Sequence, residues 1–268
     1  MAARISPVGG PVGAGDIQAV SRAAQILALF SPERPLVTVA QGAELLGLNR
    51  TTVNRYFMSL EAAGLMQRNA DQPTAFEPSR LLCQLGAFAL SQQRVTDVAP
   101  PLMRDLAAES GLTVAMALWG SVGPVVVHVA EQFFGAAAVS VRIGSQLNID
   151  SAQSQVFLAY HPDRLLAERL LATVPTDIRD GLARKIDRIR TDHVESRVSL
   201  YGVSIFGAPI FDVRGICATI AILGTSDLLP MDGSAVAAGR LLRTAREITE
   251  RMGGEWPVAD TERRYGSA

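Results

Sequence analysis

Residues 43–56 read Ala-Glu-Leu-Leu-Gly-Leu-Asn-Arg-Thr-Thr-Val-Asn-Arg-Tyr, and this stretch decides the fold of the N-terminal region. Its first residues end a helix that Thr38 can cap. Gly47 follows, and a residue without Cβ can take the left-handed conformation that terminates a helix. Asn49 can then cap a second helix over residues 50–62. Helix, glycine turn, cap and second helix in this order predict a helix-turn-helix.

The second helix of this pair divides into an inward and an outward face. Val53, Phe57 and Leu60 recur at helical spacing and predict the buried stripe. Between residues 45 and 60 the only charged side chains are two arginines, which lie outside that stripe. Such a helix can enter the major groove of DNA, where arginine reads guanine, asparagine reads adenine and short hydroxyls bond phosphate. The candidate DNA contacts on this helix and the following hairpin are Asn49, Arg50, Thr51, Thr52, Asn54, Arg55, Tyr56 and Arg68.

The flanking segments complete a winged-helix unit, expected over residues 17–78 after a flexible tail of residues 1–16. An apolar-periodic helix comes first. Residues 65–68 and 75–77 predict two short strands joined by a polar turn, in the position of a wing. Residues 79–91 predict a linker helix. An ordinary three-helix packing unit with a polar face is the alternative, and the added hairpin favours the DNA-binding interpretation.

Residues 92–252 predict a separate α+β domain, in which helices flank an antiparallel sheet. The Pro100-Pro101 pair is expected to open its first helix, and residues 253–268 to form a frayed tail. The expected strands are residues 113–119, 125–129, 138–143, 202–211 and 216–223. The expected later helices are residues 152–160, 163–171, 178–190 and 233–252.

Composition excludes several other classes of protein. The chain has 268 residues with 25 basic and 26 acidic side chains, so only a local basic surface can serve nucleic-acid binding. Two cysteines exclude a disulfide scaffold, and three widely separated histidines give no metal-site spacing. No apolar run reaches the roughly 18 residues of a membrane span, and the start lacks a signal-peptide core. We therefore expect a cytoplasmic protein with no metal, no cofactor and no membrane attachment.

Catalytic motifs are missing from the sequence, which has no GxSxG elbow, P-loop or GxGxxG segment. We therefore expect no catalytic residues and no enzyme activity. A redox switch at Cys83 or Cys217 is also disfavoured. Buried cysteine usually acts as a small hydrophobe, and no neighbouring cation in the sequence lowers the pKa of Cys217.

Three segments give the chain a resemblance to a known family. Residues 19–27 are similar to its alanine-rich first helix, residues 49–55 to its recognition helix, and residues 78–86 to its linker helix. On these motifs the chain resembles the IclR family of bacterial transcriptional regulators, over nearly all of residues 17–252. The one departure in the helix-turn-helix is Gly42, where the family usually buries leucine or isoleucine. Glycine there is expected to cost about 1 kcal/mol of helix propensity and a packing contact.

The resemblance implies a sequence-specific regulator, weakly favoured as a repressor, with a GAF-like domain that binds a small effector. It also implies a homodimer or homotetramer on a palindromic double-stranded DNA operator. The first helix is expected to add a wide apolar face for dimer contact, through Ile26, Leu29 and Phe30.

The effector positions implied by the resemblance are less polar than is usual in the family. Residues 142–147 match the entry to its pocket, but residues 148–157 lack the usual histidine, glycine and lysine. Where the family usually has a cysteine, this chain has Ile205, and where it usually has an acid, this chain has a residue near Val198. Two positions that are commonly serine in the family are Ala221 and Leu223 here. Because an unpaired buried carboxylate costs several kcal/mol, we expect a larger or less polar effector, or none. The candidate lining residues are Trp119, His128, Leu147, Ile149, Ser151, Ala152, Ile205, Cys217, Ala221 and Leu223.

Two alternatives remain open. The altered effector positions and Gly42 fit a ligand-binding or interaction module with weakened or lost DNA binding. Plain core packing also accounts for most of the candidate lining residues. An enzyme on the second domain is the least favoured interpretation.

Overall fold

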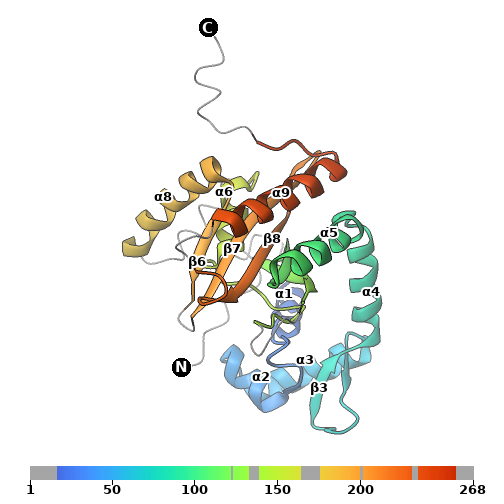
Figure 1. Ribbon diagram of the computed structural model, residues 1–268. Helices are drawn as coiled ribbons and strands as arrows, with labels where there is room; N and C mark the ends of the chain where they lie inside the picture. The colour runs from blue at the N-terminus through green and yellow to red at the C-terminus, as the bar shows by residue number, and fades with distance from the viewer. Residues whose placement is uncertain are drawn as a thin grey trace. The chain divides into compact units, whose positions relative to one another are not determined.

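The computed structural model describes residues 17–121, 123–132, 139–163, 176–199, 202–230 and 235–257 (Figure 1). The chain divides into two compact units. The N-terminal unit ends at Gln93 and the C-terminal unit begins at Arg94.

The N-terminal unit is a winged helix-turn-helix followed by one further helix. Its antiparallel sheet has the strand order β1-β3-β2, so the β2–β3 hairpin forms the wing. The elements are α1 (Gln18–Leu27), β1 (Val37–Thr38), α2 (Val39–Leu46), α3 (Arg50–Ala62), β2 (Met66–Arg68), β3 (Ala75–Pro78) and α4 (Arg80–Ser91).

The expected caps and turn of the helix-turn-helix are confirmed. Thr38 and Gln41 form a capping box at α2, in which the Gln41 backbone N–H donates to Thr38 Oγ1 at 3.3 Å. Gly47 ends α2 with φ 64°, in the left-handed region. Asn49 Oδ1 accepts a hydrogen bond from the backbone N–H of Thr52 at 2.7 Å and so caps α3. These short-range interactions fix where each helix begins and ends.

The core of this unit explains the unusual glycine of α2. Gly42 is buried, and a Cβ built there would lie 3.0 Å from Phe57 Cζ and 3.2 Å from Val53 Cγ1. The Phe57 ring therefore occupies the space of the missing side chain, packed edge-on against Phe76 at 5.1 Å between centroids. The expected loss of a packing contact at Gly42 is wrong, because α3 supplies that contact.

A leucine at position 42 should therefore destabilise the N-terminal unit by about 1–3 kcal/mol, because it overpacks a filled core. Thermal or urea unfolding followed by circular dichroism measures the change. Gly86 on α4 gives a matched control, since a Cβ there would meet nothing within 4 Å. Gly86→Leu should be neutral or slightly stabilising. Equal stability of Gly42→Leu and the wild type would refute the packing account.

The expectation that Ile26, Leu29 and Phe30 form a dimer face is wrong. Ile26 and Leu29 are almost fully buried within the N-terminal core, and Phe30 packs against the same cluster. The exposed apolar side chains of this unit lie elsewhere, at the start of α1 and along α4. They are Ile17, Val20, Leu81, Leu85, Phe88 and Leu90.

The C-terminal unit is an α+β domain built on a five-stranded antiparallel sheet of order β5-β4-β8-β7-β6. Its described helices are α5 (Val95–Ser110), α6 (Ala152–Tyr160), α8 (Thr176–Asp192) and α9 (Ala235–Met252). Its strands are β4 (Thr113–Trp119), β5 (Pro124–Ala130), β6 (Glu195–Val198), β7 (Val203–Asp212) and β8 (Gly215–Thr225).

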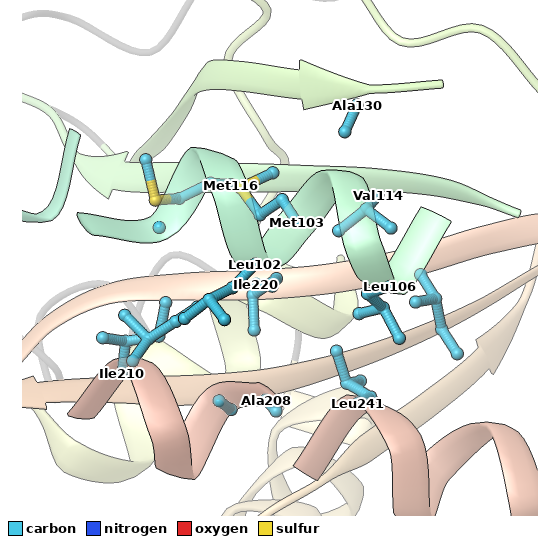
Figure 2. Packing of buried hydrophobic residues seen from close by; sticks show 14 of the residues in the cluster. Leu102, Met103, Leu106, Val114, Met116, Ala130, Ala208, Ile210, Ile220 and Leu241 are labelled. Carbon is cyan, nitrogen blue, oxygen red and sulfur yellow. The ribbon is translucent and has the colours of Figure 1, made fainter. Parts of the chain in front are cut away.

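Helices cover both faces of this sheet. Helices α5 and α9 pack on one face, where Met103 and Leu241 point toward Met116 and Ile220 of the strands (Figure 2). Helix α6 lies on the other face, with α8 packed against it and against β6. Side chains that alternate along β4 and β8 therefore enter two different cores.

The first helix of this unit begins earlier than expected. Helix α5 starts at Val95, and the Pro100-Pro101 pair lies inside it. Val95 and Ala99 are buried and continue the apolar stripe that includes Met103. Burial of these side chains offsets the backbone hydrogen bonds that the prolines remove.

Other corrections concern shorter segments. The described residues 139–143 form no strand, and a two-residue strand (β1) and the four-residue strand β6 were not expected. The expected tail after residue 252 is wrong for residues 253–257, which pack onto the unit through Trp256. The helix expected over residues 163–171 lies outside the described residues, apart from Asp163.

Candidate nucleic-acid interface and effector face

Helix α3, the recognition helix, presents a polar face to solvent. Arg50, Thr51, Asn54 and Arg55 are exposed, while Val53, on the opposite face, is fully buried. Thr52 and Tyr56 are half-buried at the border, and Asn49 is exposed beside the helix start. The arrangement places two guanidinium groups, two amides and hydroxyl groups on one helix in an order that suits base edges and phosphates.

The two arginines of this face are free of acidic partners among the described residues. None of the ion pairs there involves Arg50 or Arg55. The Asn49 side chain, by contrast, is already engaged as the helix cap. Asn49 is therefore better suited to position α3 than to read a base.

Arg68 on the wing is held by the protein itself. Its Nε lies 3.2 Å from Glu61 Oε1, its Nη1 donates to the Pro73 carbonyl at 2.8 Å, and its Cζ lies 4.7 Å from the Phe76 ring centroid. These contacts join the wing to the C-terminal half of the recognition helix. Spacing along the chain does not reveal these contacts, because the four groups come from separate segments.

The wing has a second internal network. Gln67 Nε2 and Asn69 Nδ2 donate to the two carboxylate oxygens of Glu77, each at 2.7 Å. Asn69 Oδ1 also accepts from the backbone N–H groups of Asp71 and Gln72, which shapes the turn. The two donors, Asn69 first, lower the pKa of Glu77.

Four of the candidate effector residues meet on the α6 side of the sheet. Ala221 and Leu223 are buried in a small apolar cluster with Ala115 and Val126, and Leu147 and Ile205 pack against it. We call these six residues the effector face. All six side chains are apolar, in keeping with the expected loss of polar groups.

Helix α6 borders the effector face with its first turn. Ser151 Oγ accepts from the Ser154 backbone N–H at 3.1 Å, so one of the free N–H groups at this helix start is capped. Ala152 lies against Gly207, because a Cβ built at Gly207 would lie 3.5 Å from the Cβ of Ala152. Trp119 and Ile149 belong to the neighbouring cluster between α6 and α8, and Trp119 stacks edge-on with Phe157 at 5.4 Å.

His128 and Cys217 do not join this group. His128 pairs directly across from Met116, whose side chain enters the core beneath α5 and α9, and Cys217 packs against the same core. Burial lowers the pKa of His128 and nearby Arg104 of α5 lowers it further. Both residues therefore lie on the opposite face of the sheet from Ala221, and their assignment to the same pocket is wrong.

Cys217 should react slowly with thiol reagents. Burial raises the pKa of its thiol to about 12, and its Sγ donates to the Ile210 carbonyl at 3.5 Å. At pH 8 only about one molecule in ten thousand then carries the thiolate that reacts. Titration with a disulfide reagent should modify exposed Cys83 rapidly and Cys217 only after denaturation. Two equivalents reacting at one rapid rate in the folded protein would contradict this expectation.

A cluster of aromatic rings at the end of the C-terminal unit was not predicted from the sequence. His193, Tyr160, Phe211 and Trp256 form a connected set of ring contacts. The signal available in the sequence was Trp256 itself, because a tryptophan in a supposedly frayed tail is an apolar group that needs burial.

Two other features are absent from the described ranges, a metal site and a membrane-spanning helix. No three histidine, cysteine or acidic side chains gather there in a way that would hold a metal ion. The helices of those ranges include none with the length and apolarity to cross a bilayer.

Comparison with known proteins gives the context for these two surfaces. Residues 19–70 match the IclR helix-turn-helix domain, and residues 87–250 match the C-terminal domain of bacterial transcriptional regulator IclR. The DNA-binding transcriptional repressor YiaJ of Escherichia coli is 21% identical over 252 residues, covering 88% of each chain. HmgR of Pseudomonas aeruginosa has a crystal structure that is 29% identical, with a TM-score of 0.65 over 88% of this chain and 100% of that one. A putative IclR regulator from Silicibacter sp. TM1040 shares the fold with a TM-score of 0.78 and 20% identity, over 89% of this chain and 98% of that one.

Proposed function

Because this chain belongs to the IclR family of bacterial transcriptional regulators, we propose which of its residues contact DNA. Members of this family bind DNA through a helix-turn-helix and carry a C-terminal effector-binding domain. The recognition helix reads an operator through Arg50, Asn54 and Arg55, while Thr51 and Thr52 bond the phosphates at its start. One observation carries this assignment. The only charges on that helix before Leu60 are two exposed arginines with no acidic partner among the described residues.

The operator is double-stranded and palindromic, read by two copies of the chain. The exposed apolar side chains of α4, with Phe88 64% exposed and Leu85 50% exposed, support a subunit contact in this unit. Repression is the sense of regulation that the relatives favour, since YiaJ is named a repressor. Sedimentation of the full chain should give a dimer or a tetramer, and a monomer at micromolar concentration would overturn this part of the proposal.

A mobility-shift assay with DNA from upstream of the regulated genes tests the operator assignment. The full chain should shift that DNA in the presence of excess unrelated DNA, and the affinity should fall as salt rises. A shift that unrelated DNA abolishes completely would leave only non-specific binding and would overturn the proposal.

The effector is a compound of low polarity that binds at the effector face. Ala221 and Leu223 present hydrocarbon there, so a small carboxylate placed against them would lose its hydration without gaining a charged partner. In a thermal-shift screen, uncharged apolar compounds should raise the unfolding temperature more than pyruvate does. A larger shift with pyruvate would overturn the proposal.

The alternative, an interaction module with weakened or lost DNA binding, has less support once the packing around Gly42 is known. The observation in the helix-turn-helix that favoured this alternative was Gly42, and the Phe57 ring fills the space beside that glycine. The mobility-shift assay separates the two functions, because only the regulator binds the operator selectively.

A further inference from the structure

A hollow of the C-terminal unit lies outside the effector face. It has a volume of about 200 Å³ and is lined by His193, Leu242, Arg243, Arg246 and Trp256. Leu242 and Trp256 pack against the core beneath α5 and α9, whereas the effector face lies on the α6 side of the sheet. The two sites share no residue.

The segment after α9 builds one wall of this hollow. Gly253 has φ 76°, and the chain turns there at the end of the helix (Figure 1). Gly254 then passes so close to the backbone of β7 that a Cβ would meet the Phe211 carbonyl. Trp256 follows with its ring edge-on to Phe211 at 5.9 Å and to His193 at 5.4 Å. The backbone that leads into Trp256 is therefore fixed against β7.

His193 forms the back of the hollow and is held rigidly. Its Nδ1 lies 2.6 Å from the Tyr160 hydroxyl, the Pro257 carbonyl accepts from its ring, and its backbone has φ 57°. Burial lowers the pKa of His193, and Arg246 lowers it further, against smaller opposite effects of Asp192 and Pro257. At neutral pH the imidazole is therefore an uncharged aromatic surface.

Two arginines of α9 supply positive charge at the rim. Arg243 and Arg246 are exposed on one side of α9, and neither forms an ion pair within the described part of the chain. The guanidinium of Arg246 lies 5.4 Å from the centroid of the Trp256 ring. The two guanidinium groups therefore place charged hydrogen-bond donors at the rim of the hollow.

We propose that this hollow binds a small monoanion with a flat apolar body, of the class of a one-ring aromatic carboxylate. An apolar cavity of about 150 Å³ holds benzene, so the volume here accommodates one ring. The ring lies against Leu242 and Trp256. The carboxylate accepts hydrogen bonds from Arg243 and Arg246, whose planar donors match its two oxygens. The site is a second ligand site, separate from the one proposed at the effector face.

Tryptophan fluorescence tests the proposal directly, because the chain has two tryptophans and only Trp256 lines this hollow. In full-length Trp119→Phe protein, titration with benzoate should give a saturable change in emission with one site per chain. Benzamide, which is neutral and of the same size, should bind at least about tenfold more weakly because it lacks the charge-assisted bonds.

Two variants in the Trp119→Phe background make the test specific. Arg243→Gln with Arg246→Gln should weaken benzoate binding at least about tenfold. Arg184→Gln with Arg188→Gln removes the same charge from exposed positions of α8 and should leave binding unchanged. No saturable change with benzoate, equal binding of benzamide, or equal loss in both variants would overturn the proposal. Operator binding by the wild type is measured separately and does not enter these outcomes.

Discussion

Replacing both arginines of the recognition helix by alanine should lower operator affinity by about 2–6 kcal/mol per bound helix. Each two-pronged contact between arginine and a base is worth about 1–3 kcal/mol, and well-separated contacts add. Arg50 and Arg55 have no acidic partner among the described residues, so the folded protein loses no ion pair when they are removed. Titration of labelled operator DNA at a fixed salt concentration measures the loss.

The control for this variant removes the same charge from the C-terminal unit, through Arg184→Ala with Arg188→Ala. Both side chains are exposed on α8, and operator affinity should stay within a factor of about two. The salt dependence then separates two kinds of contact. Arginines that bond phosphate reduce the slope of affinity against salt by about one each, and arginines that read bases relax specificity instead. Unchanged operator affinity in the double variant would refute the recognition surface.

Phe57→Ala should destabilise the N-terminal unit by about 3–5 kcal/mol, the usual cost of deleting a buried phenyl ring. Phe57 is fully buried, it packs edge-on against Phe76, and it fills the space above Gly42. Position 42, opposite the ring, is a glycine and has no side chain that could move into the void. Chemical denaturation of the wild type and the variant gives the change in free energy of unfolding.

Val20 provides the control for this substitution. It lies in the same unit, on α1 and outside the subunit contact proposed for α4, and it is 63% exposed, so Val20→Ala should change the stability of the unit by at most about 0.5 kcal/mol. A similar loss in the two variants would mean that Phe57 is not the centre of this core. Loss of operator binding by Phe57→Ala at a temperature where the unit stays folded would point to a role in shaping α3.

The helix-turn-helix could be predicted because its signals are local. Thr38, Gly47 and Asn49 each act within three or four residues of their own position, so spacing in the sequence reveals them. The relation between Gly42 and Phe57 is different, because it joins two helices across a core. The missing side chain at Gly42 is evident from the sequence, whereas the Phe57 ring that fills its space is evident only from the structure.

The faces of the C-terminal sheet could be predicted only in part. Alternation along a strand assigns faces correctly until a bulge inserts one residue. The pairing of β4 with β5 shifts after Met116, and that of β7 with β8 shifts after Ile210. Each shift moves the residues beyond it to the other face. Counting by twos from Val126 and Ala221 would therefore place His128 and Cys217 on the effector face, which their side chains do not reach.

The contacts of Arg68 have a consequence for how the winged helix meets DNA. Its bonds to Glu61 and Pro73 and its stacking on Phe76 exist in the free protein, so the wing is already fixed against the recognition helix. Binding then loses little conformational entropy from ordering the wing. A recognition helix with only two arginines before Leu60 can thus achieve useful affinity through preorganisation, and we expect its association with DNA to involve rigid docking and no folding of the wing.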